Sequence, residues 1–483
     1  MSRESQFRLK SCPKHYTYDQ DKTIDPLETV KNASSRLNKM FDLSSFRVEA
    51  RADAIEGAYS FSSVSDQFNA SGKGLTPEQS QASAVMEFAE RYSWLHYDYK
   101  HADGYALKSF NEVKQGDTPT VDQSYFLANL VEQQKKEAQY LDEIKAIPMK
   151  WVKGVSLLDY KKFYYPINWH NYFFTSNGLA TGNAMEEAIV QALCEVIERE
   201  NIYRLFVEQQ MPNDLDQGSL KHPLITRVLE NSEKKGIKFT IKDISYDLGV
   251  PTFIACGVSQ ADEGTLIHKG CGQGTHPNPE KALIRALSEY FESYSLLKKR
   301  VKDVDVDWRP ILPRLEKKYT GFLPLYNPGI LDQRKKVVKL KDLPDLSRND
   351  IKDEIDHILG VLKKRGYNVI FIDKTHPELQ VPVPRIFVPG FRSVISTETE
   401  DPLFIMSRAY FEAGDAEIAQ ELFDRSFLKS AFFMPEMAGK TKVKKVFKKD
   451  YQQNIIAFGG YKKSSVDKLK TLLKVYRFLG GKM

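Results

Sequence analysis

The chain has 483 residues, of which 41% are hydrophobic and 28% are charged, and its formal net charge is +6. This composition is typical of a globular protein and excludes collagen-like and largely disordered chains. Because it lacks an apolar run of about 18 residues and its start, MSRESQFRLK, has no apolar signal core, we expect a cytoplasmic protein.

The predicted elements begin with a helix over residues 26–41, after a polar start. Residues 44–71 alternate loosely between apolar and polar side chains, which indicates strands. Residues 123–147 have the pattern of a helix, and residues 149–157 that of a strand.

Two later stretches each indicate a pair of strands. Residues 238–259 are broken by Gly249 and Pro251, and residues 367–390 by Pro377 and Pro382. Helical and strand patterns are interleaved along the whole chain. We therefore expect a mixed, α+β fold.

The cysteines suggest no framework. No Cys-x-x-Cys spacing occurs, so we expect neither a disulfide scaffold nor a structural zinc site from the four residues Cys12, Cys194, Cys256 and Cys271. For Cys271 we expect a small buried side chain, with a reactive thiol as the alternative.

Three segments repeat one arrangement of glycine, a polar or proline-containing stretch, and a helix with the pattern Glu-x-x-Glu. They read GKGLTPEQSQASAVMEFAERYSW (72–94), GNAMEEAIVQALCEVIEREN (182–201) and GQGTHPNPEKALIRALSEYFESY (272–294). The paired glutamates are Glu87 and Glu90, Glu195 and Glu198, and Glu289 and Glu292.

This spacing places the carboxylates on one face of each helix, because residues i and i+3 lie close in angle. In the second helix Glu187, Glu195 and Glu198 share an arc, with Ile189 and Leu193 on the opposite side. Each helix therefore has an apolar face for packing and a compact acidic face.

Two interpretations of these faces are open from spacing alone. Single Glu-x-x-Glu pairs are usually solvated, and Glu–Arg pairs four residues apart are common on helix surfaces. If three such faces converge, however, they need a compensating cation. Carboxylates near arginines suit Mg²⁺ and a polyphosphate, although the sequence has no Walker motif G-x-x-x-x-G-K-[ST].

The segment SNGLATGNAMEEAIVQALCEVIERE (176–200) resembles the central motif of the YcaO family. The first and third repeats resemble that family's flanking motifs, in the same order. The segments LGVPTFIACG (248–257) and IDKTHPELQVPVPRIFVPG (372–390) resemble two later family segments. The resemblance covers about residues 20–400.

The resemblance implies a fold of the family's own, with the repeated glycine-turn and Glu-x-x-Glu helix units around one non-Walker ATP site, and ATP and Mg²⁺ as cofactors. It implies an N-terminal segment (1–40), a YcaO catalytic domain (41–410) and a C-terminal extension with a basic tail (411–483). Family members activate a peptide backbone amide. A nucleophile adds to the carbonyl, ATP phosphorylates the resulting oxygen, and phosphate leaves.

The resemblance also implies roles for single residues, while no catalytic residue is assigned. Four glutamates are expected to hold the metal: Glu87, Glu187, Glu195 and Glu198. The expected nucleotide-binding residues are Lys22, Thr29, Glu90, Asn183, Arg199, Arg285 and Glu289.

The nucleophile decides the product within this family: sulfide gives a thioamide, and Cys, Ser or Thr side chains give azolines. Azoline-forming members usually end in a proline-rich tail, whereas no proline follows Pro435 here. We therefore expect thioamide formation with a sulfide donor. The alternatives are an azoline-forming cyclodehydratase acting on a ribosomally made precursor peptide, and a non-catalytic ATP-binding accessory protein in ribosomal-protein modification.

The expected partners are a peptide or protein substrate, a separate protein that delivers sulfur or binds a leader peptide, and a second copy of the chain in a homodimer. Residues 440–483 carry 13 Lys and Arg against two Asp, and this basic tail is a candidate docking surface. We do not expect membrane or nucleic-acid binding, since KTKVKKVFKK (440–449) has no aromatic interleaving apart from Phe447.

Overall fold

The computed structural model describes residues 7–40, 46–51, 55–65, 69–98, 100, 102–126, 139–174, 176–265, 267–302, 328–393, 406–407, 410–411 and 413–425. Among them, no helix combines the length and the apolar character needed to cross a membrane. The basic tail and most of the predicted C-terminal extension lie outside the described residues.

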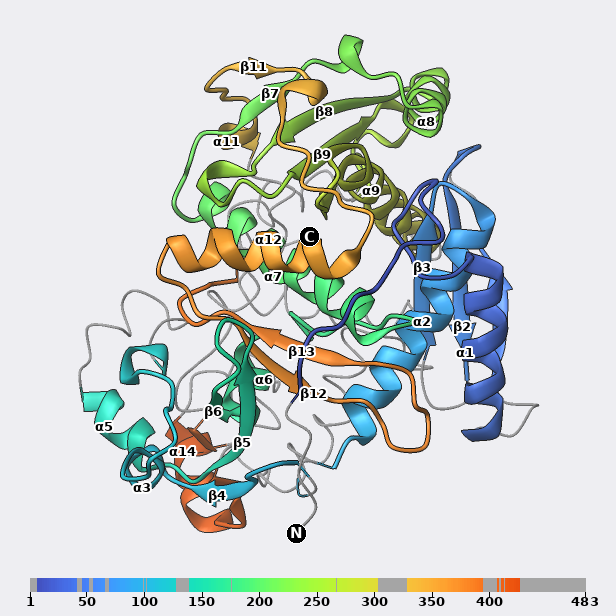
Figure 1. The fold of residues 1–483 in the computed structure, drawn as a ribbon. Helices are drawn as coiled ribbons and strands as arrows, with labels where there is room; N and C mark the ends of the chain where they lie inside the picture. The colour runs from blue at the N-terminus through green and yellow to red at the C-terminus, as the bar shows by residue number, and fades with distance from the viewer. Residues whose placement is uncertain are drawn as a thin grey trace.

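The described residues form three β-sheets with helices packed around them (Figure 1). The first sheet is antiparallel and has the strand order β1-β2-β3. Its strands are β1 (Arg47–Ala50), β2 (Tyr59–Val64) and β3 (Asn69–Gly74).

The second sheet has five strands in the order β10-β9-β8-β7-β11. Only the pairing of β11 with β7 is parallel. The strands are β7 (Asn213–Leu215), β8 (Ile237–Asp243), β9 (Thr252–Ser259), β10 (Lys269–Thr275) and β11 (Val337–Val338).

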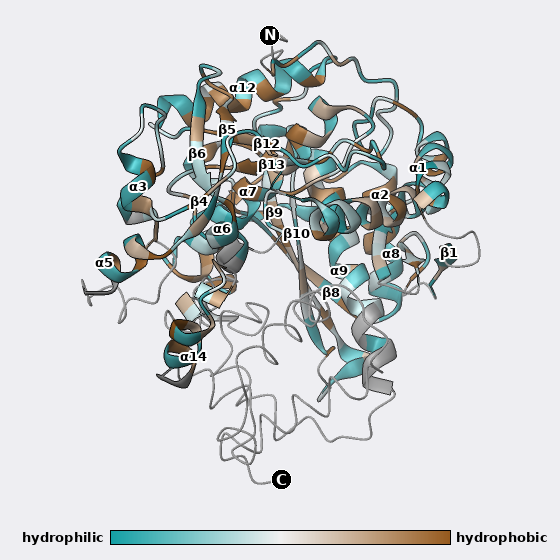
Figure 2. Ribbon diagram, turned by 90° about the horizontal axis from the view of Figure 1, so that it is seen from below, coloured by the Kyte–Doolittle hydropathy of each residue, from teal (hydrophilic) through white to brown (hydrophobic). Residues whose placement is uncertain are grey.

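The third sheet has the order β13-β12-β5-β4, with β6 paired to β5. Figure 2 shows its apolar strands β12 and β13 near the middle of the molecule, among helices with hydrophilic faces. The strands are β4 (Ala106–Lys108), β5 (Met149–Ser156), β6 (Lys162–Pro166), β12 (Ile370–Asp373) and β13 (Pro384–Phe387).

Three long helices carry the Glu-x-x-Glu patterns: α2 (Pro77–His96), α7 (Met185–Phe206) and α9 (Pro279–Lys302). The other α-helices are α1 (Pro26–Met40), α3 (Phe110–Lys114), α5 (Gln139–Ala146), α6 (Ile167–Phe174), α8 (Pro223–Lys234), α11 (Pro328–Leu331), α12 (Ile351–Lys364) and α14 (Ala416–Arg425).

The glycines before α2 and α9 lie in strands, not in the turns that the sequence suggested. Gly72 is in β3 and Gly272 is in β10. A Cβ at Gly272 would lie 2.2 Å from the carbonyl oxygen of Ala286, and one at Gly72 would lie 2.1 Å from the backbone nitrogen of Ala84. Glycine is required because each strand lies directly against the backbone of the helix that follows it.

A segment that we call the N-terminal strap (residues 10–23) touches the beginnings of four helices. The Lys10 amide donates to Glu186 at 2.8 Å, and the Cys12 amide donates to Asp350, which caps α12, at 2.8 Å. Figure 1 shows the strap in dark blue, running past α12 and α2 towards α1.

The strap reaches α2 and α9 through two aspartates. Asp19 is fully buried and accepts from the hydroxyl of Thr76, the N-cap residue of α2, at 3.0 Å. Asp21 forms an ion pair with Lys281 in the first turn of α9. The strap therefore fixes the relative positions of the three acidic helices at their N-terminal ends.

The mixed helix and sheet fold is confirmed. Both strand pairs predicted around Gly249 and around residues 377–382 are present as β8–β9 and β12–β13. The helix predicted over 123–147 is described only in part, as a 3-10 turn at Gln123–Phe126 and as α5. The strand β10 was not predicted, and β3 was predicted only as far as residue 71, because glycines hid the alternation of apolar and polar side chains.

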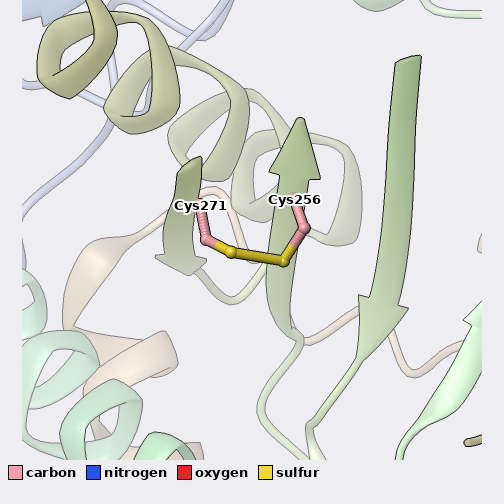
Figure 3. The surroundings of a disulfide bond; sticks show 2 residues. All are labelled: Cys256 and Cys271. Carbon is pink, nitrogen blue, oxygen red and sulfur yellow. A yellow bond between two sulfur atoms is a disulfide. The ribbon is translucent and has the colours of Figure 1, made fainter. Parts of the chain in front are cut away.

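The expectation of no disulfide is wrong. Cys256 and Cys271 are directly paired across β9 and β10, with a Cα–Cα separation of 4.1 Å, and their sulfurs are bonded (Figure 3). Cys12 and Cys194 are free and buried. Cysteine spacing failed as a guide because an antiparallel pair brings together residues 15 positions apart.

Candidate functional site

The middle residue of Gly-Lys-Gly in β3 joins the first acidic helix to the third. Because side chains alternate along a strand, Lys73 points away from α2, on which its neighbouring glycines pack. The Nζ of Lys73 lies 3.0 Å from Oε2 of Glu289 and 3.4 Å from Oε2 of Glu292, both on α9. A cation of the first unit thus neutralises carboxylates of the third.

The middle residue of Gly-Gln-Gly in β10 plays the corresponding part towards α7. The Oε1 of Gln273 accepts a hydrogen bond from Nη1 of Arg199 at 2.9 Å. A second polar contact runs from α9 to α7, where Nη1 of Arg285 donates to Oε1 of Gln191 at 2.5 Å. These two contacts hold α7 beside β10 and α9.

Helix α2 completes the cluster. Nη2 of Arg91 lies 3.2 Å from Glu87, and Nη1 lies 3.8 Å from Glu90. Burial lowers the pKa of Arg91, but Glu87, Glu90 and Glu195 outweigh burial and raise this pKa above its ordinary value. Since Glu195 belongs to α7, the charges of carboxylates on two helices act on one guanidinium.

Several carboxyl groups in the cluster are incompletely neutralised. Burial, opposed by Arg199 and reinforced by Glu289, raises the pKa of Glu198 to about 7. A cation that enters the cluster would therefore displace protons. Burial raises the pKa of four glutamates in all: Glu90, Glu195, Glu198 and Glu292.

Glu289 has the opposite shift. Burial acts to raise its pKa, but Lys73 and then Arg199 outweigh burial and lower the pKa below its ordinary value. Lys73 was not among the predicted site residues. Its Gly-Lys-Gly context was visible in the sequence, but only the strand places its side chain against α9.

Three arginines in the cluster have buried N–H groups with no hydrogen-bond acceptor among the described residues. These are Nη1 of Arg51, Nε and Nη1 of Arg91, and Nε of Arg285. An unpaired buried donor costs about 1–3 kcal/mol. Guanidinium groups bind phosphate oxygens strongly through their paired N–H donors, so these donors fit a polyphosphate.

Arg51 was also missed by sequence reasoning. It directly follows β1, and the charges of Glu292 and Glu87 act on it, although burial outweighs them and lowers its pKa. Nothing in its sequence context, FRVEARA, distinguishes it from a surface arginine. Only the pairing of β1 with β2 brings it to the cluster.

Glu187 lies apart from this cluster, because residues of the N-terminal strap bind its carboxylate. Its Oε2 accepts from the amide and the hydroxyl of Thr23 at 2.9 and 2.8 Å, and its Oε1 accepts from the side-chain amide of Asn183 at 3.2 Å. Lys22 Nζ lies 3.4 Å from Oε1. Burial acts to raise the pKa of Glu187, but Lys22 and these donors outweigh burial and lower the pKa.

The two residues predicted near the start of the chain differ in their surroundings. Lys22 joins the second unit through Glu187. Thr29 is buried in α1, and its hydroxyl donates to the carbonyl of Asp25 at 3.1 Å, one turn earlier. The structure therefore brings Lys22 to the beginning of α7 and leaves the Thr29 hydroxyl bonded to its own helix.

The donor set fits Mg²⁺ that is held jointly by protein and nucleotide. Among the described residues, no group of three His, Cys, Asp or Glu side chains is preassembled around one metal position. Mg²⁺ commonly takes one or two carboxylates and completes its coordination with phosphate oxygens and water. Incompletely neutralised glutamates beside unpaired arginine donors meet that requirement.

The unpaired arginine donors and incompletely neutralised glutamates are typical of a site that binds a nucleotide together with Mg²⁺ without a Walker loop. A family model described as YcaO cyclodehydratase, ATP- and Mg²⁺-binding, matches residues 71–392, which is more than half of the chain. The chain belongs to the YcaO family. The expected cofactors, ATP and Mg²⁺, are confirmed by this membership.

Two curated relatives extend over most of the matched region. An uncharacterized protein of Methanothermobacter thermautotrophicus is 29% identical over 348 residues, covering 68% of this chain and 82% of the relative. The ribosomal protein S12 methylthiotransferase accessory factor YcaO of Escherichia coli is 24% identical, covering 68% of this chain and 58% of the relative.

Two solved structures share the fold. A heterocyclase in complex with substrate and cofactor has a TM-score of 0.64 at 21% identity, over 80% of this chain and 55% of its own. YcaO from Methanopyrus kandleri, bound with AMPPCP and Mg²⁺, has a TM-score of 0.57 at 19% identity, over 79% of this chain and 94% of its own. These similarities confirm the YcaO-type fold, while the internal repeat stays a prediction. Family membership supports an ATP-dependent enzyme of the amide-activating or cyclodehydrating type.

Proposed function

We propose that the protein activates a backbone amide of a peptide or protein by ATP-dependent phosphorylation of the amide oxygen. We further propose that sulfide is the nucleophile and a thioamide the product. The observation that carries the amide-activating part is the cluster on α2, α7 and α9, where incompletely neutralised glutamates adjoin arginines with unpaired buried donors.

The proposed roles follow from these surroundings. Bound ATP would supply the phosphoryl group that turns the amide oxygen into a leaving group, with Mg²⁺ neutralising its charge. Glu87, Glu195 and Glu198 are the proposed metal ligands. Arg199 and Arg285 are proposed to bind phosphate, and to them we add three residues that the structure contributed: Arg51, Lys73 and Arg91.

Four further residues are proposed to position the nucleotide or the protein groups around it. Glu90 and Glu289 flank the proposed phosphate position, on α2 and α9. Asn183 and Lys22 act on Glu187, whose oxygens are already engaged by protein donors. Glu187 was predicted to be a metal ligand. We now propose a positioning role for it at the start of α7.

The choice of nucleophile distinguishes the proposal from its alternative. An azoline-forming cyclodehydratase would use a Cys, Ser or Thr side chain of the substrate, and the heterocyclase similarity keeps this alternative open. The accessory role named for the Escherichia coli relative is a third outcome, with ATP bound and no amide modified. A separate partner protein, a homodimer and a cytoplasmic location stay part of the proposal.

The test starts from nucleotide binding and ends with product mass. The full chain is titrated with Mg²⁺ and a non-hydrolysable ATP analogue, and then incubated with ATP, isotopically labelled sulfide and peptide and ribosomal fractions. Labelled sulfur in a peptide, dependent on ATP, is the expected result. Loss of one water without label identifies azoline formation, and binding without either change identifies an accessory protein.

Two variants test the site itself. Glu198→Gln keeps the size of the side chain and removes its charge, so Mg²⁺-dependent nucleotide binding should fall at least tenfold, a loss of about 1.4 kcal/mol. The exposed Glu28→Gln on α1 is the matched control and should bind as wild type. Unchanged binding by Glu198→Gln would refute the metal assignment.

A further inference from the structure

The disulfide between Cys256 and Cys271 lies at the border between the second sheet and α7. The two residues oppose each other in the ladder of β9 and β10 (Figure 3). Cys271 is only 4% exposed, whereas Cys256 is half-buried. A reductant therefore has a more open approach to the sulfur of Cys256 than to that of Cys271.

The disulfide shares one face of β10 with Gln273. The glycines at 272 and 274 face α9, since a Cβ on either would meet the α9 backbone at 2.2 Å. Side chains alternate along a strand, so Cys271 and Gln273 both point to the opposite face. There Gln273 accepts the hydrogen bond of Arg199 at 2.9 Å.

Helix α7 provides a second connection between the disulfide and the proposed ATP site. Ile202 and Tyr203 of α7 belong to the same apolar cluster as Cys271, and Cys256 packs against that cluster. They lie about one helical turn beyond Glu198 and Arg199. The strand that carries Gln273 therefore also carries Cys271, and the helix that carries Arg199 shares an apolar cluster with the disulfide.

We propose that Cys256 and Cys271 form a reversible thiol–disulfide site whose state sets the position of Arg199 and thereby the nucleotide affinity. The effect on nucleotide affinity rests on the function proposed above, whereas the thiol–disulfide exchange itself does not. The disulfide fixes the strand that carries Gln273, so the oxidised protein holds its donors ready for phosphate and binds the nucleotide more tightly. Two separate thiols need more van der Waals space and press on α7.

The exchange uses a dithiol as its reductant. One thiolate of the dithiol attacks the sulfur of Cys256, and Cys271 leaves as a thiolate that takes up a proton. The second thiol of the reductant then attacks the mixed disulfide and releases Cys256. Two electrons and two protons pass to the protein, and the dithiol becomes a cyclic disulfide. Oxidised glutathione reverses the reaction through a mixed disulfide with one of the cysteines.

The first experiment counts thiols and measures affinity. The full chain is treated with dithiothreitol or with oxidised glutathione, desalted, alkylated under denaturing conditions and weighed. All four cysteines should be alkylated in the reduced protein, and only Cys12 and Cys194 in the oxidised protein. The Kd for a non-hydrolysable ATP analogue with Mg²⁺ should be about threefold or more higher in the reduced protein.

Variants and a nucleotide-free readout make the outcomes distinct. The double variant Cys256→Ser, Cys271→Ser should lose the redox response, and Cys12→Ala should keep it. Hydrogen–deuterium exchange without nucleotide should quicken on reduction at residues 269–275 and 198–204. Four alkylated cysteines under both treatments would overturn the site, as would equal exchange in both states. If no nucleotide binds in either state while exchange responds, the proposed function fails and the thiol site stands.

Discussion

Thr23 donates both its backbone amide and its hydroxyl to one oxygen of Glu187, at 2.9 and 2.8 Å, across 164 positions of sequence. The carboxylate is almost fully buried, with 2% of its side chain exposed. Hydrogen bonds to a buried charge contribute more than neutral ones. This pair therefore attaches the N-terminal strap to the first turn of α7.

Thr23→Val keeps the shape of the side chain and removes the hydroxyl. The loss of a hydrogen bond to a buried carboxylate should lower the free energy of unfolding by about 1.5–3 kcal/mol, measured by urea denaturation. Thr226→Val is the control, because the Thr226 hydroxyl donates only to carbonyls of residues 222 and 223 near the start of α8. Equal losses in the two variants would show that the strap contact has no special weight.

The raised pKa of Glu198 predicts that the stability of the protein depends on pH. Burial raises its folded-state pKa from 4.5 to about 7, so folding retains a proton that the unfolded chain releases. The stability tied to that proton is present below pH 4.5 and is lost as the pH rises to about 7. Glu198→Gln should therefore raise the Tm of the nucleotide-free protein at pH 8 by about 2 °C or more, with little change at pH 4.5.

The same variant should respond less to ligand. Mg²⁺ with an ATP analogue should raise the Tm of the wild-type protein more than that of Glu198→Gln, because the charged carboxylate is the proposed metal ligand. A variant that is no more stable at pH 8 would contradict the raised pKa. A variant that is stabilised by ligand as fully as the wild type would contradict the metal role.

Asp21 predicts the opposite pH dependence. Burial acts to raise its pKa, but the neighbouring His276, Lys281 and Lys14 outweigh burial and lower the pKa below 3.8. The contribution of ionised Asp21 to the free energy of unfolding is thus present above pH 3.8. It is lost as the pH falls through the lowered folded-state pKa. Asp21→Asn should cost about 3–5 kcal/mol at pH 7, since it removes the carboxylate that pairs with the largely buried Lys281, while Lys14 keeps its ion pair with Glu354.

Urea denaturation at several pH values checks the Asp21 prediction. The difference between wild type and Asp21→Asn should be constant from pH 7 to pH 5 and should shrink only below about pH 4. Asp356→Asn removes the partner of Lys352 at the surface, where Asp356 is 47% exposed, and should cost less than about 1 kcal/mol. A cost for Asp21→Asn as small as this would mean that the strap is not held by its buried charges.

Two glycine-to-alanine substitutions should have opposite effects. Gly272→Ala places a methyl group 2.2 Å from the Ala286 carbonyl oxygen, so β10 and α9 must separate and the protein should lose several kcal/mol of stability. Gly360 lies inside α12 with nothing within 4 Å of a built Cβ. Gly360→Ala should therefore stabilise the protein by up to about 1 kcal/mol, measured by denaturation.

Sequence periodicity was sufficient for the fold class and for the three acidic helices. The 3.6-residue repeat in α2, α7 and α9 depends only on neighbours along the chain, so it can be read locally. The strands β3 and β10 could not be read in this way. Their helix-facing positions are glycines in close contact with a helix backbone, and a glycine carries no apolar signal.

The acidic residues of the site could be predicted from the sequence, whereas several of its basic residues could not. Glutamates three residues apart indicate a shared helix face. Arg51 and Lys73, in contrast, reach the cluster only through the pairing of β1, β2 and β3. Glu187 shows that the spacing of glutamates does not reveal which groups bind them. Its spacing is that of the other acidic residues, yet a distant threonine engages its carboxylate.

The N-terminal strap has a consequence for biosynthesis. The ion pair between Lys14 and Glu354 joins residues 340 positions apart. During translation the strap is made before α7, α9 and α12, to which it attaches. The strap must therefore stay undocked until α12 has been made, and a chaperone that shields it should raise the yield of native protein.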